Sequence, residues 1–306
     1  MSKIWTTDDI PDMSGKVVIV TGGNSGIGFE TALALAQKRA TIVIAVRNME
    51  KGADAVNKIK AAYVSANVKA MKLDLSDLTS VKAFAANFLN NYKSLAILIN
   101  NAGIMYPPFH LTKDGFESQF GGNHLGHFAL TGLLLPHLIS TPNSRVITQS
   151  SLVAHDAHIN FDNLDGSKGY SRKFYGQSKL ANLLFAKELQ NKFRSNHINS
   201  VSVACHPGIS HTNLGSFGSG KQANIFLRMI SSMISQPAHM GALPALYSAT
   251  SSTIKGGEYI APDSKGGKKG YPTNDTIIEK LYDSNISNKL WNVSEDLTGI
   301  SFKFEK

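Results

Sequence analysis

Val17-Val18-Ile19-Val20-Thr21-Gly22-Gly23-Asn24-Ser25-Gly26-Ile27-Gly28 is the stretch of this chain that decides its fold. The β-branched run that opens it predicts a buried strand, and residues 29–39 carry apolar side chains at helical spacing. Glycines let the backbone between strand and helix turn sharply and approach a pyrophosphate, whose charge a helix N-terminus stabilises. The stretch therefore predicts a dinucleotide site formed by Thr21, Gly22, Asn24, Ser25, Gly26, Ile27 and Gly28.

Two other interpretations of this turn fail on spacing. No Gly-Lys-Ser or Gly-Lys-Thr follows the glycines, which excludes a kinase-type phosphate loop. Ser25 is followed directly by Gly26, which excludes the Gly-x-Ser-x-Gly elbow of hydrolases.

The end of the second β-branched run, Thr41 to Val46, indicates which dinucleotide is bound. Arg47 stands there, about 20 residues past the last glycine, where an acidic residue would bond the ribose of NAD and an arginine accommodates the extra phosphate of NADP. We expect NADP(H), with Arg47 and Asn48 beside it. The alternative is that Arg47 only ends a strand in solvent.

Strand and helix patterns alternate along the whole chain, which predicts an α/β fold: a Rossmann-type, doubly wound parallel sheet of about seven strands with helices on both faces. We expect one domain, 1–306. The stretch from His211 to Gln236 interrupts the alternation of strand and helix patterns. Residues 206–240 are a candidate substrate-side lid, with an ordinary surface excursion as the alternative. The expected strands are 17–21, 41–46, 68–73, 95–100, 145–150, 199–205 and 257–260, and the clearest helices are 29–39, 78–91, 128–138 and 180–193.

Composition indicates an ordinary globular protein, with 42% hydrophobic and 17% charged residues. No apolar run reaches the ~18 residues of a membrane span and the start lacks the core of a signal peptide, so we expect no span and a cytoplasmic location.

The net charge of +9 is mostly scattered, and its one cluster, Lys265 to Gly270, has no aromatic platform, so we expect no nucleic-acid partner. The single cysteine, Cys205, excludes an intramolecular disulfide and ends a strand pattern, so we expect a buried thiol without a role.

Tyr175 and Lys179 are the pair that says most about chemistry. On a helix, residues four apart share one face, which places the ammonium beside the phenol. A nearby cation favours the phenolate, and we expect Lys179 to lower the Tyr175 pKa from about 10 so that the phenol can exchange a proton with an alcohol or carbonyl oxygen.

The chain resembles the short-chain dehydrogenase/reductase family through Thr21 to Gly28, Asn100-Asn101-Ala102-Gly103, Ser150-Ser151 and Tyr175 to Lys179, in the family's order over nearly the whole chain. Within that family it looks most like the branch of retinol dehydrogenases and light-dependent protochlorophyllide reductases. The motifs that carry this likeness are Arg47-Asn48, Phe120 to Phe128, Tyr175 to Asn182 and Cys205-His206-Pro207-Gly208.

The resemblance implies a catalytic set in which Tyr175 is the acid or base, Lys179 also holds the nicotinamide ribose, Ser151 bonds the reacting oxygen and Asn123 holds a water linking Lys179 to solvent. The alternatives are that Asn123 only satisfies buried backbone and that Ser151 only ends a strand. Ser150 competes with Ser151, but strand neighbours face opposite ways and the family register favours Ser151.

The resemblance also extends the cofactor site beyond the glycine turn. It implies that Asp74 and Leu75 contact the adenine, with the alternative that Asp74 caps the next helix. The remaining positions that it places beside the cofactor are Asn101, Ala102, Gly103, Tyr175, Lys179, Pro207 and Gly208.

The segment Leu152 to Phe174 is longer than in the commonest family members, although the retinol-dehydrogenase branch carries a similar insertion. It holds several possible metal ligands without a defined spacing, so we expect a solvated loop and no metal. The same expectation covers His124 and His127. The insertion's candidates are His155, Asp156, His158, Asp162 and Asp165.

These observations predict an NADP(H)-dependent oxidoreductase that transfers hydride to or from a small-molecule carbonyl or alcohol, with carbonyl reduction the expected direction. The apolar run Ile104 to Phe109 and the lid residues favour a lipophilic substrate, unless they are core. The lid residues concerned are Leu214, Phe217, Ile225, Phe226 and Met229. Alternatives are a tetrapyrrole photoreductase and a non-catalytic NADP(H) sensor. The sequence leaves the substrate and the oligomeric state open.

Overall fold

A single eight-stranded sheet organises the computed structural model, which describes residues 4–209 and 236–304. The strand order is β3-β2-β1-β4-β5-β6-β7-β8, and all pairs are parallel except the last, in which β8 runs antiparallel to β7. The predicted doubly wound α/β fold is confirmed. The strands are β1 (Val17–Thr21), β2 (Thr41–Val46), β3 (Val68–Lys72), β4 (Ile97–Asn100), β5 (Arg145–Gln149), β6 (Val201–Cys205), β7 (Tyr259–Pro262) and β8 (Pro272–Asn274).

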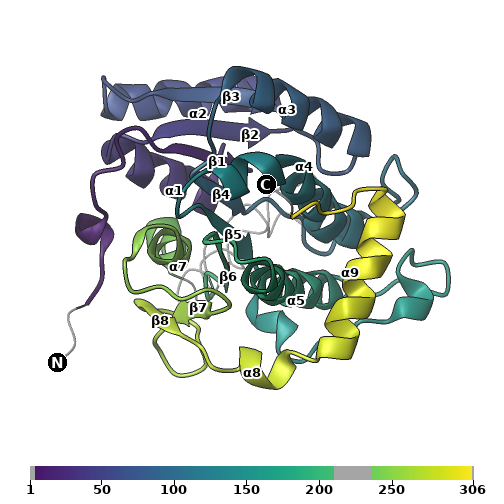
Figure 1. The fold of residues 1–306 in the computed structure, drawn as a ribbon. Coiled ribbons are helices and arrows are strands. Elements are labelled where there is room, and N and C mark those ends of the chain that lie inside the picture. Colours follow the sequence, from purple (N-terminus) through teal and green to yellow (C-terminus); the bar gives the residue numbers. More distant parts are fainter. Residues whose placement is uncertain (1–3, 210–235, 305–306) are drawn as a thin grey trace, which may run out of the picture.

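Helices cover both faces of the sheet because successive strand residues point to opposite sides. Val18 and Val20 of β1 pack with α1 and α7, whereas Ile19 between them packs with α3 and α4. Figure 1 shows α1 and α7 on one side of the strands and α4 and α5 on the other. The longer helices are α1 (Gly26–Gln37), α2 (Met49–Ala62), α3 (Leu78–Asn91), α4 (Gly126–Ser140), α5 (Lys173–Ser195), α7 (Ala238–Thr250) and α9 (Ser284–Thr298).

Short helical turns complete the fold, and they place several residues of interest. The most unusual is η2, a π-helix that runs directly into α4 and contains Asn123. Within residues 4–209 and 236–304, no helix joins the length and the apolarity that a bilayer crossing requires. The short elements are η1 (Thr7–Asp9), η2 (Phe120–Leu125), η3 (Leu152–Ala154), η4 (Phe161–Asn163) and α8 (Ile278–Leu281).

The order of the strands fixes where a ligand binds. The chain winds from β1 to β2 and β3 on one side, then returns to place β4 against the other edge of β1. In open parallel sheets, ligands bind beyond the carboxyl ends of the strands at such a switch point. Thr21, which ends β1, and Asn100, which ends β4, therefore mark the position of the site.

Candidate active site

The glycine turn after β1 leaves the N-terminus of α1 without a side-chain cap. Ser25 is the N-cap residue in extended conformation, yet its hydroxyl bonds no backbone N–H of α1, and the first turn holds no acidic residue. By contrast, Asn48, Asp77 and Asp283 cap α2, α3 and α9 with their side chains. An uncapped helix start after a glycine turn suits a phosphate, which supplies the missing acceptor and the negative charge.

The turn after β4 packs directly against the glycine turn. Gly22 has φ +67°, a conformation that favours glycine, and a Cβ there would lie 3.0 Å from the Cβ of Ala102. A Cβ on Gly28 would lie 2.5 Å from Asn101 Nδ2 and 2.6 Å from the carbonyl oxygen of Gly22. Asn101 Nδ2 also donates to the carbonyl of Thr21 over 2.8 Å. The two predicted cofactor turns thus form one rigid surface without room for added side chains.

Arg47 lies exposed at the end of β2, where the NADP phosphate is expected. Its backbone carbonyl accepts a hydrogen bond of 2.6 Å from Lys72 Nζ, which places a second cation at the end of β3. Asn48 accepts from Lys51 N and caps α2. The sequence reasoning missed Lys72, which only strand pairing brings beside Arg47.

Asp74 does not cap the next helix, which was the alternative to its predicted role. Its carboxylate accepts from the backbone N–H and the hydroxyl of Ser76, at 3.0 and 2.6 Å. Asp77 caps α3 instead. Asp74 and Leu75 form a fixed turn between β3 and α3, against which the start of α4 packs so closely that a Cβ on Gly126 would lie 2.4 Å from the Leu75 carbonyl oxygen.

Two neighbouring serines after β5 point in different directions, as alternation predicts. The Ser150 hydroxyl donates to the carbonyl of Lys179 over 2.7 Å and is fixed against α5. Ser151 is half-buried, and its side chain lies near that of Tyr175 and lowers the pKa of the phenol. The structure therefore brings together the two hydroxyls that the sequence assigns to the reacting oxygen.

The environment of Tyr175 corrects one prediction. Burial raises the pKa of the phenol to about 12, an effect that the nearby Ser151 side chain opposes only in part and that Tyr106 reinforces. Lys179 Nζ lies 5.8 Å from the centroid of the tyrosine ring and donates to the Gln149 carbonyl over 3.2 Å. The expected lowering of the tyrosine pKa by Lys179 is wrong here because desolvation dominates.

Lys179 itself lies at the centre of the site. Burial lowers the pKa of its ammonium from 10.5 to about 8, partly opposed by Cys205. A Cβ on Gly103 would lie 3.4 Å from Nζ and 3.2 Å from Asn123 Oδ1, so the lysine and the asparagine converge on this glycine. Cys205 itself is buried, and desolvation raises its pKa to about 12, so its thiol stays protonated and unreactive.

The Asn123 side chain is fully used within the protein. Its Oδ1 accepts from Ile104 N over 2.8 Å, and its Nδ2 donates to the Ile104 carbonyl and to Ser178 Oγ, both over 3.0 Å. Asn123 thus ties the segment after β4 to α5. A water held for Lys179 would have to donate to the second lone pair of Oδ1 or to the backbone carbonyl, because both amide protons are already donated.

The turn after β6 lies against the loop that follows β7. Gly208 has φ +63°, and Ile209 N donates to the Lys268 carbonyl over 2.8 Å. Gln236 Nε2 donates to the Pro207 carbonyl, so the two ends of the candidate lid meet at the predicted nicotinamide turn. Residues 210–235 of that lid, which include the five apolar residues named as substrate-facing candidates, lie outside the described part of the chain.

One group that joins the insertion to the segments after β6 and β8 has the composition of a metal site. Ring nitrogens of His155 and His206 and a carboxylate oxygen of Asp275 lie within 4.8 Å of one another. However, His206 Nδ1 accepts a hydrogen bond from Gly208 N over 3.1 Å, which places the proton of the neutral ring on Nε2. A metal ligand needs the opposite arrangement, a free lone pair on one nitrogen and a donor N–H on the other, so this geometry does not suit a metal.

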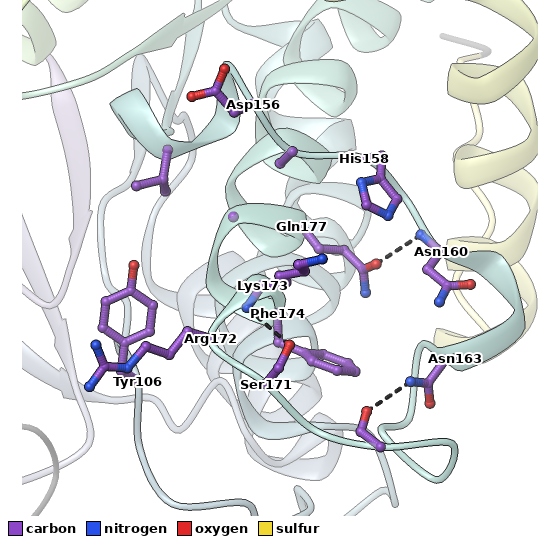
Figure 2. A pocket seen from close by; sticks show the side chains of 14 residues that line it. Tyr106, Asp156, His158, Asn160, Asn163, Ser171, Arg172, Lys173, Phe174 and Gln177 are labelled. Carbon is purple, nitrogen blue, oxygen red and sulfur yellow. Dashed lines mark hydrogen bonds between the residues drawn. The ribbon is translucent and has the colours of Figure 1, made fainter.

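A cavity of about 410 Å³ lies between the insertion and the start of α5 (Figure 2). Polar side chains such as Asp156, His158 and Asn160 surround it, and Tyr106 forms one wall. Neither Ser151 nor Tyr175 lines this cavity, which therefore lies beside the candidate site. Tyr106 connects the two: its ring meets that of Tyr175 edge-on at 5.2 Å, and its backbone is held at φ +53°. The sequence reasoning did not single out this residue.

The pattern that defines the short chain dehydrogenase family matches residues 16–219. The chain belongs to this family of oxidoreductases. It is 40% identical to retinol dehydrogenase 11 of Mus musculus, over 94% of this chain and 88% of that protein, and 39% identical to human retinol dehydrogenase 13, over 94% and 85%. The predicted family and its retinol dehydrogenase branch are confirmed.

Solved structures agree with this assignment. The crystal structure of an uncharacterized protein from Mycobacterium paratuberculosis has 38% identity and a TM-score of 0.80, covering 98% of this chain and all of the other. A short chain dehydrogenase from Escherichia coli complexed with NADPH shares the fold, with 21% identity, a TM-score of 0.63 and 81% and 97% coverage.

Proposed function

We propose that this short-chain dehydrogenase uses NADPH to reduce a lipophilic aldehyde or ketone to an alcohol. The observation that carries the proposal is the proximity of the Ser151 and Tyr175 side chains at the carboxyl end of the sheet, with Lys179 beside them. When bound, NADPH supplies the hydride. The residues of the chain supply the proton, the orientation and the stabilisation of charge.

A protonated Tyr175 is the state that carbonyl reduction requires. With a pKa of about 12, the phenol keeps its proton at neutral pH and can donate it to the carbonyl oxygen as negative charge develops there. Ser151 donates a second hydrogen bond to the same oxygen. Both donors are held in place before the reaction, so they stabilise the transition state more than the ground state.

The residues present fit an NADP cofactor. The uncapped start of α1 suits the pyrophosphate, exposed Arg47 with neighbouring Lys72 suits the additional phosphate, and buried Lys179 suits the nicotinamide ribose. The same fold holds NADPH in the E. coli protein.

A lipophilic substrate is supported by two observations. The relatives with 38–40% identity include several proteins named retinol dehydrogenase, and retinol is a largely apolar alcohol. The segment from Ile104 to Phe109 also brings Tyr106 against the catalytic tyrosine and leaves Phe109 48% exposed.

The test is an NADPH-oxidation screen against aldehydes and ketones of increasing chain length. Replacing Tyr175 by Phe should lower kcat on the best substrate by roughly 10²- to 10⁴-fold while leaving NADPH affinity within a factor of about three, because only the proton donor is lost. Tyr247→Phe, in α7 on the other face of the sheet, is the matched control. Equal rates for Tyr175→Phe and the parent would refute the assigned role.

NADPH binding without turnover of any substrate would favour a sensor, and turnover only of a tetrapyrrole under light would favour the photoreductase.

The cofactor assignment has its own test. Arg47→Asp should reverse the preference for NADP over NAD, weakening NADP binding by roughly 10- to 100-fold because a charged hydrogen bond is replaced by repulsion. Lys60→Asp, an exposed change in α2, is the control. An unchanged ratio of the two affinities in Arg47→Asp would contradict the assignment.

A further inference from the structure

His127 is buried in the first turn of α4 and bonds to both halves of the candidate site. It is 1% exposed, and each ring nitrogen has a partner: Nε2 lies 2.9 Å from Thr21 Oγ1, and Nδ1 lies 2.9 Å from the backbone carbonyl oxygen of Asn123. Thr21 ends β1 at the glycine turn. The imidazole therefore stands between the cofactor turn and the catalytic asparagine.

The surrounding donors fix the position of every proton in this network. A carbonyl oxygen can only accept, so Nδ1 of His127 carries the proton and Nε2 is an acceptor. Thr21 Oγ1 already accepts from the N–H groups of Asn101 and Ala102, at 2.9 and 3.0 Å. Its single proton is therefore free for Nε2, which at 2.9 Å is closer than the Ile99 carbonyl at 3.3 Å.

The network continues from Asn123 to the helix that carries the tyrosine. Asn123 Nδ2 donates to Ser178 Oγ, which donates to the Tyr175 carbonyl over 2.9 Å. A continuous set of hydrogen bonds thus joins the turns after β1 and β4 to η2 and then to α5. All of its side chains except those of Asn101 and Ala102 are buried.

We propose that His127 is a positioning residue of the active site, which holds the cofactor turns of β1 and β4 in register with Asn123 and, through Ser178, with Tyr175. This inference rests on the proposed function, because it concerns how the assembled site is aligned. The ring acts in its neutral form with the proton on Nδ1. Burial keeps it neutral by lowering the pKa to about 4, and the charge of Lys179 acts in the same direction.

His124 provides an internal comparison. It is equally buried and lies three residues earlier, but its Nε2 bonds Ser294 Oγ of α9 over 2.9 Å and its Nδ1 has no hydrogen-bond partner among residues 4–209 and 236–304. Its ring packs near Phe120 and Phe185, away from the cofactor turns. Loss of His124 should therefore affect the packing of α9 and not the alignment of the site.

The experiment compares His127→Phe with His124→Phe, since phenylalanine roughly keeps the volume of the ring and removes its hydrogen bonds. Three quantities are measured: the Kd for NADPH, kcat with the best carbonyl substrate and the melting temperature. We expect His127→Phe to raise Kd and to lower kcat, each by roughly tenfold, because a buried hydroxyl and a buried carbonyl lose their partner. We expect His124→Phe to change Kd and kcat by less than about threefold, even if it lowers the melting temperature as much as His127→Phe does.

A second variant keeps the test decisive if His127→Phe does not fold. Thr21→Val removes the same hydrogen bond from the other end, together with those that Thr21 Oγ1 accepts from Asn101 N and Ala102 N, and His127→Gln keeps one donor and one acceptor. Thr21→Val should raise the NADPH Kd, and His127→Gln should fall between the parent and Thr21→Val. Wild-type Kd and kcat in a folded His127→Phe, or in Thr21→Val where His127→Phe does not fold, would overturn the inference. A parent enzyme that neither binds NADPH nor reduces a carbonyl would instead refute the proposed function.

Discussion

The two sides of the candidate site are built differently. On the cofactor side, the turns after β1 and β4 contact each other so closely that Gly22 and Gly28 have no room for a side chain, and Thr21 and Asn101 bond across the gap. On the substrate side, Tyr106 is held in a left-handed backbone conformation, Phe109 and Leu111 are about half exposed, and a cavity separates the insertion from α5. The shape of the cofactor side is therefore fixed by backbone geometry, whereas the shape of the substrate side depends on individual side chains.

The largest effect should come from filling the contact between the two cofactor turns. Gly28→Ala places a Cβ 2.5 Å from Asn101 Nδ2 and 2.6 Å from a backbone oxygen, which forces the turns apart. We expect a loss of stability of about 1–3 kcal/mol and a loss of NADPH affinity of at least tenfold. Thermal unfolding and NADPH titration measure both.

Gly122 offers the matched control for that substitution, because a Cβ added there meets no atom of the described residues within 4 Å beyond its chain neighbours and its own helix. Gly122→Ala should leave NADPH affinity unchanged. If Gly28→Ala behaved in the same way, the close contact of the two turns would have no part in cofactor binding.

A pH profile tests the centre of the site with an intermediate effect. The folded-state pKa of Lys179 is about 8, so its ammonium is mostly charged at pH 7 and loses its proton as pH rises through 8. We expect NADPH affinity to fall above pH 8, approaching a tenfold loss per pH unit once the neutral amine dominates, if the charge binds the cofactor. Lys179→Met should bind weakly at all pH values. A parent enzyme with constant affinity from pH 7 to 9.5 would contradict the assignment of Lys179 to the cofactor.

The smallest effect should come from the substrate side. Tyr106→Ala removes the ring that meets Tyr175 edge-on. We expect the KM for the longest aldehydes to rise by about three- to tenfold, from the loss of roughly 1 kcal/mol of aromatic contact, with NADPH affinity unchanged. Val64→Ala, a 93% exposed position in the turn after α2, is the control and should change neither. An altered NADPH affinity in Tyr106→Ala would show that the two sides are not separate.

The same division decides what the sequence could predict. The apolar runs of strands β1 to β7 and the glycines of the turn are local features of the sequence. The positions of these elements were therefore predicted within a few residues. Strand β8 was missed because it has three residues, starts with Pro272 and pairs antiparallel at the edge, so no alternating pattern marks it. The helix α9 was also not singled out; its buried face packs on α5 and α4, which only the tertiary fold brings together.

Side-chain chemistry was harder to predict than backbone position. His127 was set aside together with His124. The sequence shows that the two histidines lie three residues apart, but it does not reveal the hydrogen-bond partners of either. The tyrosine pKa was predicted in the wrong direction because residue spacing reports the distance to a cation but not the depth of burial. The NADP preference, the lid and the site roles stay predictions.

The π-helical turn at residues 120–125 has one last consequence for the helix that follows it. A π-helical turn contains one residue more than an α-helical turn. This extra residue rotates the side chains of the following helix by about 100° about the helix axis. Deleting a single residue here would let an ordinary helix form, yet it would rotate His127 out of line with Thr21. Selection on this enzyme is therefore expected to tolerate changes of residue type in the bulge far better than changes of its length.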